Sequence, residues 1–186
     1  IEEMMIQANV AAAESLEQRK SPLVYRIHDA PSKEKLKSLR DFLETLDLEI
    51  PPHGSLKPGA FNKVLSAAKS LPVPELVNEV ILRSQAQAEY NPENIGHFGL
   101  ALDEYAHFTS PIRRYPDLLV HRGIRHALAD GRPDGFTYTP RAMEQLGQEC
   151  SLRERRADEA CRDVVQSLKC EFMRNRVGEE FDAVVT

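Results

Sequence analysis

Apolar residues recur three or four positions apart over most of the chain, which is the spacing of amphipathic helices. The first such stripe runs from Ile1 to about Arg19, and Ser21-Pro22 ends it because proline disfavours helical backbone before it. Ser32 can cap a second helix that continues to the loop starting at Pro51. The same spacing predicts four further helices, at residues 60–70, 74–88, 111–129 and 140–176, the fifth of the six ending at Asp130-Gly131.

Strand-like patterns are short and few. Residues Leu23–His28 alternate in polarity and are rich in β-branched and aromatic side chains, so they predict a strand. Two runs between Tyr90 and Ser110, FGLAL and YAHFTS, predict a hairpin or a pair of strands. A last alternating run, Glu180–Thr186, is typical of the first strand of a new sheet or barrel. We therefore expect an α+β fold in which helices pack on a few strands.

Composition narrows the class of protein. With 186 residues and 41% hydrophobic content, the chain can bury one main core. No window approaches the roughly 20 apolar residues that span a bilayer, so we expect a cytoplasmic protein without a membrane partner. The three cysteines are 11 and 9 positions apart in a charged helical segment, a spacing that predicts reduced thiols. A net charge of −5 excludes a globally basic nucleic-acid binder, so any RNA site must be a local patch.

One local patch of this kind exists. Between His107 and His126 there are four arginines and one aspartate, giving +4 − 1 = +3 with histidines neutral. Guanidinium groups bind phosphate oxygens in pairs, and Thr109, Ser110 and the free N–H groups at a helix start add donors. The patch predicts a bound phosphodiester.

Structural roles compete with this interpretation. Arg113 and Arg114 can form ion pairs with Asp117 or with the acidic first helix. The aromatic residues Tyr105, Phe108 and Tyr115 can stack on bases, or they can anchor the segment in the core. His97 and His107, ten positions apart, are more typical of structural or RNA-contacting histidines than of metal ligands, since no HExxH or CxxC partner accompanies them.

A family resemblance covers essentially the whole chain. The segment HFTSPIRRYPDLLVHR is very similar to the signature that closes the RNB catalytic domain of ribonucleases R and II, and IEEMMIQANVAAA resembles a helix of that domain. The resemblance continues through LVYRIHDAP, YNPENIGHFGLAL and ERRADEACRDV, and it favours the ribonuclease R branch. It implies that residues 1–176 are the C-terminal part of an RNB domain and that 177–186 begin an OB-fold RNA-binding domain.

The resemblance also implies a function. It predicts part of a processive, magnesium-dependent 3′-to-5′ exoribonuclease that hydrolyses single-stranded and structured RNA to nucleoside 5′-monophosphates. Arg113 would be the catalytic residue, gripping the terminal phosphates, and Glu2 or Glu3 would contact RNA near its 3′ end, with the choice between them open. The full set of predicted RNA contacts is Glu2, Glu3, Thr109, Ser110, Arg113, Arg114, Tyr115, His121 and Arg122.

The aspartate cluster that holds metal in the family has no counterpart in this sequence. Its ten aspartates are dispersed from Asp29 to Asp182, whereas magnesium needs clustered oxygen ligands. We therefore expect no metal site in this chain, an upstream part of the same domain as its partner, and no activity in isolation. Both chain ends are expected to be cut from a longer protein.

Two other function classes stay open on the sequence alone. A non-catalytic RNA-binding module would bind RNA in a salt-sensitive way but never support hydrolysis. A mostly helical interaction scaffold would do neither, and its basic patch would tolerate charge reversal.

Overall fold

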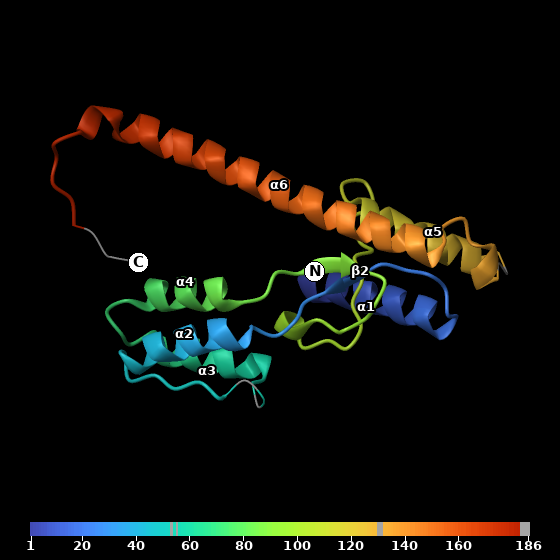
Figure 1. The fold of residues 1–186 in the computed structure, drawn as a ribbon, viewed down its shortest axis with the longest axis horizontal. Coiled ribbons are helices and arrows are strands. Elements are labelled where there is room, and N and C mark those ends of the chain that lie inside the picture. The colour runs from blue at the N-terminus through green and yellow to red at the C-terminus, as the bar shows by residue number, and fades with distance from the viewer. Residues whose placement is uncertain (53, 55, 130–131, 183–186) are drawn as a thin grey trace.

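The computed structural model describes residues 1–52, 54, 56–129 and 132–182, and helices dominate them (Figure 1). Two short strands pair antiparallel, with Arg26 opposite Tyr90. The α+β expectation is therefore confirmed. In chain order the elements are α1 (Glu2–Gln18), β1 (Tyr25–Ile27), α2 (Lys33–Glu44), α3 (Pro58–Ala68), α4 (Pro74–Ser84), β2 (Glu89–Asn91), the 3-10 turn η2 (Phe98–Leu100), α5 (Tyr115–Leu128), η3 (Pro133–Gly135), α6 (Pro140–Met173) and η4 (Arg174–Arg176).

The six predicted helices are confirmed, and local chemistry explains several of their ends. Ser32 and Thr139 cap α2 and α6, each accepting a hydrogen bond from a backbone N–H in the first turn. Pro58, Pro74 and Pro140 occupy first turns, where a missing N–H costs nothing. The predicted stop of the fifth helix at residues 130–131 lies outside the described residues.

The predicted hairpin between Tyr90 and Ser110 is wrong. FGLAL forms the turn η2, and Ala101 after it is left-handed with φ 55°, so the run cannot continue as a strand. His97 makes only isolated bridges, to His28 and to Leu102. YAHFTS has no strand ladder either; Arg26 donates its N–H to the Tyr105 carbonyl, and side chains hold the rest of the segment.

The apolar residues divide into separate cores. At one end of the molecule α2, α3 and α4 pack together around nine buried apolar residues, among them Leu39, Val64 and Val77. The other core joins α1, β1 and α5, with Leu16, Ile27 and Val120 buried in it. A small third cluster, including Leu119 and Met143, fixes α5 and the start of α6 against the strands.

Helix α6 is anchored at its N-terminal half by a close approach to β2. A Cβ at Gly147 would lie 2.6 Å from the Tyr90 carbonyl oxygen, so only glycine permits this distance. One turn later, the buried Ser151 hydroxyl accepts the Tyr90 N–H at 2.9 Å and donates to the Gly147 carbonyl. Arg26 adds a bidentate ion pair to Glu154. The helix therefore packs directly against the main chain of β2, which requires small side chains at Gly147 and Ser151.

The C-terminal half of α6 is exposed on all sides and extends past α4 (Figure 1). Its apolar side chains Val164, Leu168 and Phe172 are more than half exposed. The strand predicted for Glu180–Thr186 falls mainly on residues 183–186, outside the described part, so it stays a prediction.

None of the helices in the described part of the chain combines the length and apolar character needed to cross a bilayer. Cys150, Cys161 and Cys170 are free thiols, as expected.

Gly147→Ala is expected to lower the free energy of unfolding by about 1–3 kcal/mol, because the added methyl meets main-chain atoms that cannot rotate away. Gly59→Ala is the matched control: it also lies in a helix, but a Cβ there meets nothing within 4 Å, so it should be neutral or stabilising by up to about 1 kcal/mol. Urea unfolding measures both. Equal stability of the two variants would contradict the close-approach explanation.

Candidate phosphate-binding site

The basic segment around residues 107–114 is tied to α1 by one buried amide. Asn9 accepts hydrogen bonds at Oδ1 from the N–H groups of Phe108 (2.9 Å) and Thr109 (3.1 Å). Its Nδ2 donates to the Tyr105 hydroxyl at 2.9 Å, and the Asn9 side chain is buried. One side chain thus satisfies three polar groups and fixes the start of the basic loop against the first helix.

A buried carboxylate holds the other end of this loop. Asp117, fully buried in the first turn of α5, accepts at Oδ1 from the Ser110 N–H (2.7 Å) and from Arg114 Nη2 (2.8 Å). Asp117 Oδ2 and Arg114 Nε are buried without partners among the described residues. Of the open choices for the two arginines, the structure therefore assigns Arg114 to the ion pair with Asp117.

Arg113 has a different environment. Its side chain is exposed and makes no ion pair or hydrogen bond with any residue that the structure describes. Together with Thr109 and Arg114 it lines a cavity of about 510 Å³. The loop thus presents one unpaired guanidinium on a segment fixed at both ends, which is a suitable arrangement for an anion.

Helix α1 contributes to the same cavity. Glu2 is among its lining residues, with Ile1, Met5 and Asn9, whereas Glu3 is not. Both glutamates are exposed in the first helical turn. The structure therefore brings Glu2 together with Arg113 and Thr109, and it leaves Glu3 outside this lining.

The aromatic candidates separate by burial. Tyr105 is only 7% exposed and Phe108 packs against the α1/α5 core, so both anchor the loop. Tyr115 is 42% exposed and is the accessible one of the three. His121 stacks on the Phe108 ring at 4.3 Å and its Nε2 bonds the Phe108 carbonyl, which gives it a structural role; its predicted RNA contact stays a prediction.

Arg122 lies between two tyrosines. Its guanidinium carbon is 5.8 Å from the ring centroids of both Tyr115 and Tyr138, and its Nη1 bonds the Tyr138 hydroxyl. The Tyr138 hydroxyl, 3.5 Å from the Tyr115 hydroxyl, raises the pKa of Tyr115. Sequence reasoning missed Tyr138 because it precedes α6 in a segment without periodicity. It also missed Asn9, whose only signal was a polar residue on the apolar face of a helix.

Histidines lie behind the loop in neutral form. His107 Nδ1 is 2.9 Å from the Tyr90 hydroxyl, and burial, with nearby Arg114, lowers the pKa of His107 to about 3. Burial likewise lowers the pKa of His97 to about 4, and its ring packs edge-on against Tyr105. Both are structural in this arrangement.

No group of three or more metal-ligating side chains comes together within the described part of the chain. The side chains around the cavity do not fit the oxygen-rich site that magnesium requires either, since Glu2 is the single carboxylate among the described residues that line it.

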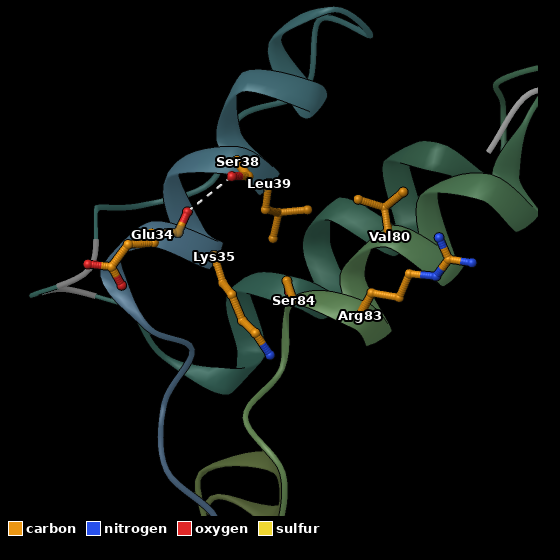
Figure 2. A pocket seen from close by; sticks show the side chains of 7 residues that line it. All are labelled: Glu34, Lys35, Ser38, Leu39, Val80, Arg83 and Ser84. Carbon is orange, nitrogen blue, oxygen red and sulfur yellow. Dashed lines mark hydrogen bonds between the residues drawn. The ribbon is translucent and has the colours of Figure 1, made fainter. Parts of the chain in front are cut away.

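A separate pocket of about 300 Å³ lies between α2 and α4 (Figure 2). Leu39 and Val80 form its apolar walls. Its cations are engaged in the fold, since Lys35 Nζ donates to the Gln85 carbonyl at 2.9 Å and Arg83 pairs with Glu79. Because both of these cations are engaged, this pocket does not offer a guanidinium of the kind that Arg113 presents.

Replacing Asn9 tests the tie between α1 and the loop. Asn9→Leu keeps the branched shape of the side chain but leaves three polar partners unsatisfied, so the free energy of unfolding should fall by about 2–4 kcal/mol. Hydrogen exchange at the Phe108 and Thr109 amides should accelerate more than at α6. The exposed neighbour substitution Gln7→Leu should change neither, and unchanged exchange at both amides in Asn9→Leu would refute the role.

The neutral histidines make stability depend on pH. Because the folded-state pKa values of His97 and His107 lie below the unfolded value of about 6.5, the unfolded chain binds more protons in the range between. The free energy of unfolding should therefore fall as pH drops from 7 to 5. Urea unfolding across this range should show a shallower slope for His107→Gln. An identical slope would mean that His107 does not stay neutral.

The chain is similar to known proteins in both sequence and structure. The model of the RNB domain matches residues 1–130. Ribonuclease R of Escherichia coli (strain K12) is 48% identical over 194 residues, covering 100% of this chain and 24% of that protein. RNase R of Mycoplasma genitalium in complex with ribose-methylated single-stranded RNA superposes with a TM-score of 0.85 at 29% identity, covering 96% of this chain and 28% of that one.

The same enzyme in complex with double-stranded RNA gives a TM-score of 0.83 at 29% identity, covering 96% of this chain and 32% of that one. The chain thus spans about a quarter of the length of the ribonuclease R relatives that it matches. The loop at residues 110–114, helix α1 and both strands are all within the part that the family model matches. The chain belongs to the RNB family, with ribonuclease R proteins as its relatives.

Proposed function

We propose that this chain forms the RNA-gripping part of a processive 3′-to-5′ exoribonuclease that degrades single-stranded and structured RNA to nucleoside 5′-monophosphates in the cytoplasm. Support comes from the RNB match, from ribonuclease R relatives along the whole chain, and from solved relatives bound to RNA. Residues 1–176 would belong to the RNB domain, and 177–186 would begin an OB-fold domain.

The observation that carries the proposal is the contrast between two adjacent arginines. Arg114 is committed to buried Asp117, and this pair fixes the loop. Arg113 projects into the cavity without a partner among the described residues. A guanidinium on a fixed loop at this position can receive the phosphoryl oxygens near the scissile bond and stabilise the charge that develops there.

The remaining contacts follow from the cavity. The Thr109 and Ser110 hydroxyls would assist in binding phosphate, since the N–H groups of both residues already donate to Asn9 and Asp117. Glu2, rather than Glu3, would lie near the 3′-terminal sugar because it lines the cavity. Tyr115 and Arg122 would bind a base and a neighbouring phosphate, and Arg114 and His121 would support the loop.

Magnesium would be held by carboxylates of the upstream part of the domain, which we propose as the partner of this chain, because the described residues bring no suitable cluster together. In the hydrolytic reaction the residues of this chain would orient the strand and polarise the phosphate. The chain alone is then expected to bind RNA without cleaving it.

Arg113→Ala provides the test, in the complete protein encoded with this chain and with single-stranded RNA and magnesium. We expect kcat to fall by about 100- to 1000-fold, with a smaller rise in KM, because the contact strengthens as charge develops. Arg113→Lys should restore only part of the loss, since an ammonium group cannot bind two oxygens side by side.

Arg162→Ala is the matched control, as Arg162 is an exposed arginine on the distant half of α6. It should leave kcat unchanged. Full activity in Arg113→Ala would refute the catalytic role. Salt-sensitive RNA binding without hydrolysis in the complete wild-type protein would instead show a non-catalytic RNA-binding module.

A further inference from the structure

A second cavity, of about 520 Å³, lies over the C-terminal half of α5 and the segment that leads into α6. The described residues in its walls carry guanidinium, imidazole and aromatic groups and no carboxylate. The lining residues are Arg122, Arg125, His126, Phe136, Thr137 and Tyr138. Such a lining offers positive charge for an anion and flat apolar faces for a ring.

The charges of this cavity are not balanced by ion pairs within the described part of the chain. Arg122 and Arg125 are three positions apart on α5, so they share one helix face, and neither forms an ion pair with a described residue. Two neighbouring cations repel each other unless an anion lies between them. Cations also stabilise a helix C-terminus, but that effect is limited to the last turn and so applies to Arg125 and His126, not to Arg122.

The aromatic walls are held in place. Phe136 and Tyr138 pack against the cluster of Val24, Leu119 and Met143, and their rings are 5.6 Å apart in an edge-to-face arrangement. Both remain half-buried, so part of each ring faces the cavity. Because their positions are fixed in advance, a planar ligand would lose little free energy in ordering them.

Tyr115 lies between residues of the two cavities. It directly follows Arg114, which lines the Arg113 cavity, and its ring centroid is 5.8 Å from the guanidinium carbon of Arg122, which lines the second cavity.

We propose that this second cavity binds one nucleotide unit, with its phosphate between Arg122 and Arg125 and its base against Phe136 and Tyr138. The choice of a nucleotide over another aromatic anion rests on the proposed function. The unit can come from two sources: a released nucleoside 5′-monophosphate or an internal nucleotide of a bound strand. The volume of about 520 Å³ is within the range of small-molecule sites.

Binding is measured by calorimetry with adenosine 5′-monophosphate, inorganic phosphate and adenosine, in an Arg113→Ala background of the complete protein so that the first cavity contributes little. The nucleotide should bind more tightly than either of its parts. Arg125→Ala should weaken both nucleotide and phosphate about tenfold, as expected for one charge-assisted contact. Phe136→Leu should weaken the nucleotide but not phosphate, because it removes the stacking face and keeps an apolar side chain in the cluster.

Arg162→Ala is again the matched control and should leave all three affinities unchanged. A short single-stranded oligoadenylate separates the two sources. If Arg125→Ala weakens the oligonucleotide as well, the cavity takes an internal nucleotide of a strand; if it weakens only the mononucleotide, the cavity takes the released product.

Nucleotide affinity that is the same in Arg125→Ala, Phe136→Leu and the Arg162→Ala control would overturn the inference. The result is independent of the proposed function, which is read from the loss of hydrolysis in Arg113→Ala alone. Loss of hydrolysis together with unaltered nucleotide binding in Arg125→Ala would therefore keep the first proposal and reject the second.

Discussion

The buried side-chain amide of Asn9 is the interaction on which the site depends. It joins α1 to the start of the basic loop through three hydrogen bonds, and it thereby sets the distance between Glu2 and Arg113 across the cavity. A buried amide is costly when its partners are missing, so the loop has one strongly favoured position. An apolar residue would pack equally well on the helix but would leave the loop free to shift.

The second constraint is the division of roles between Arg113 and Arg114. Burying a carboxylate as Asp117 is buried requires a cation nearby, and Arg114 supplies it while also closing the turn. The Arg114 guanidinium therefore has a structural role. Arg113, one residue earlier, gains its freedom from the same turn, because the backbone that directs Arg114 inward directs its neighbour toward solvent.

Periodicity predicted the helices because each buries one stripe, as Leu36, Leu39 and Leu43 do in α2. It failed between Tyr90 and Ser110, where side chains such as Asn9 and Asp117 hold the backbone and leave no repeating pattern. The family resemblance pointed to Arg113 and the glutamate pair. It could not indicate that Tyr138 lies beside Arg122, since that contact joins residues from two different segments.

The anchoring of α6 has a mechanical consequence. Its N-terminal half packs on β2 at Gly147 and Ser151 and pairs with Arg26 through Glu154, whereas the exposed residues 156–173 project without contacts to other described elements of the core for 18 residues, or roughly 27 Å at the rise of an α-helix. The helix is therefore fixed in its N-terminal half and exposed in its C-terminal half. A tilt of about 5° at the anchored end would move the far end by roughly 2 Å. The absence of a Cβ at position 147 thus sets the direction of the longest helix in the described part of the molecule.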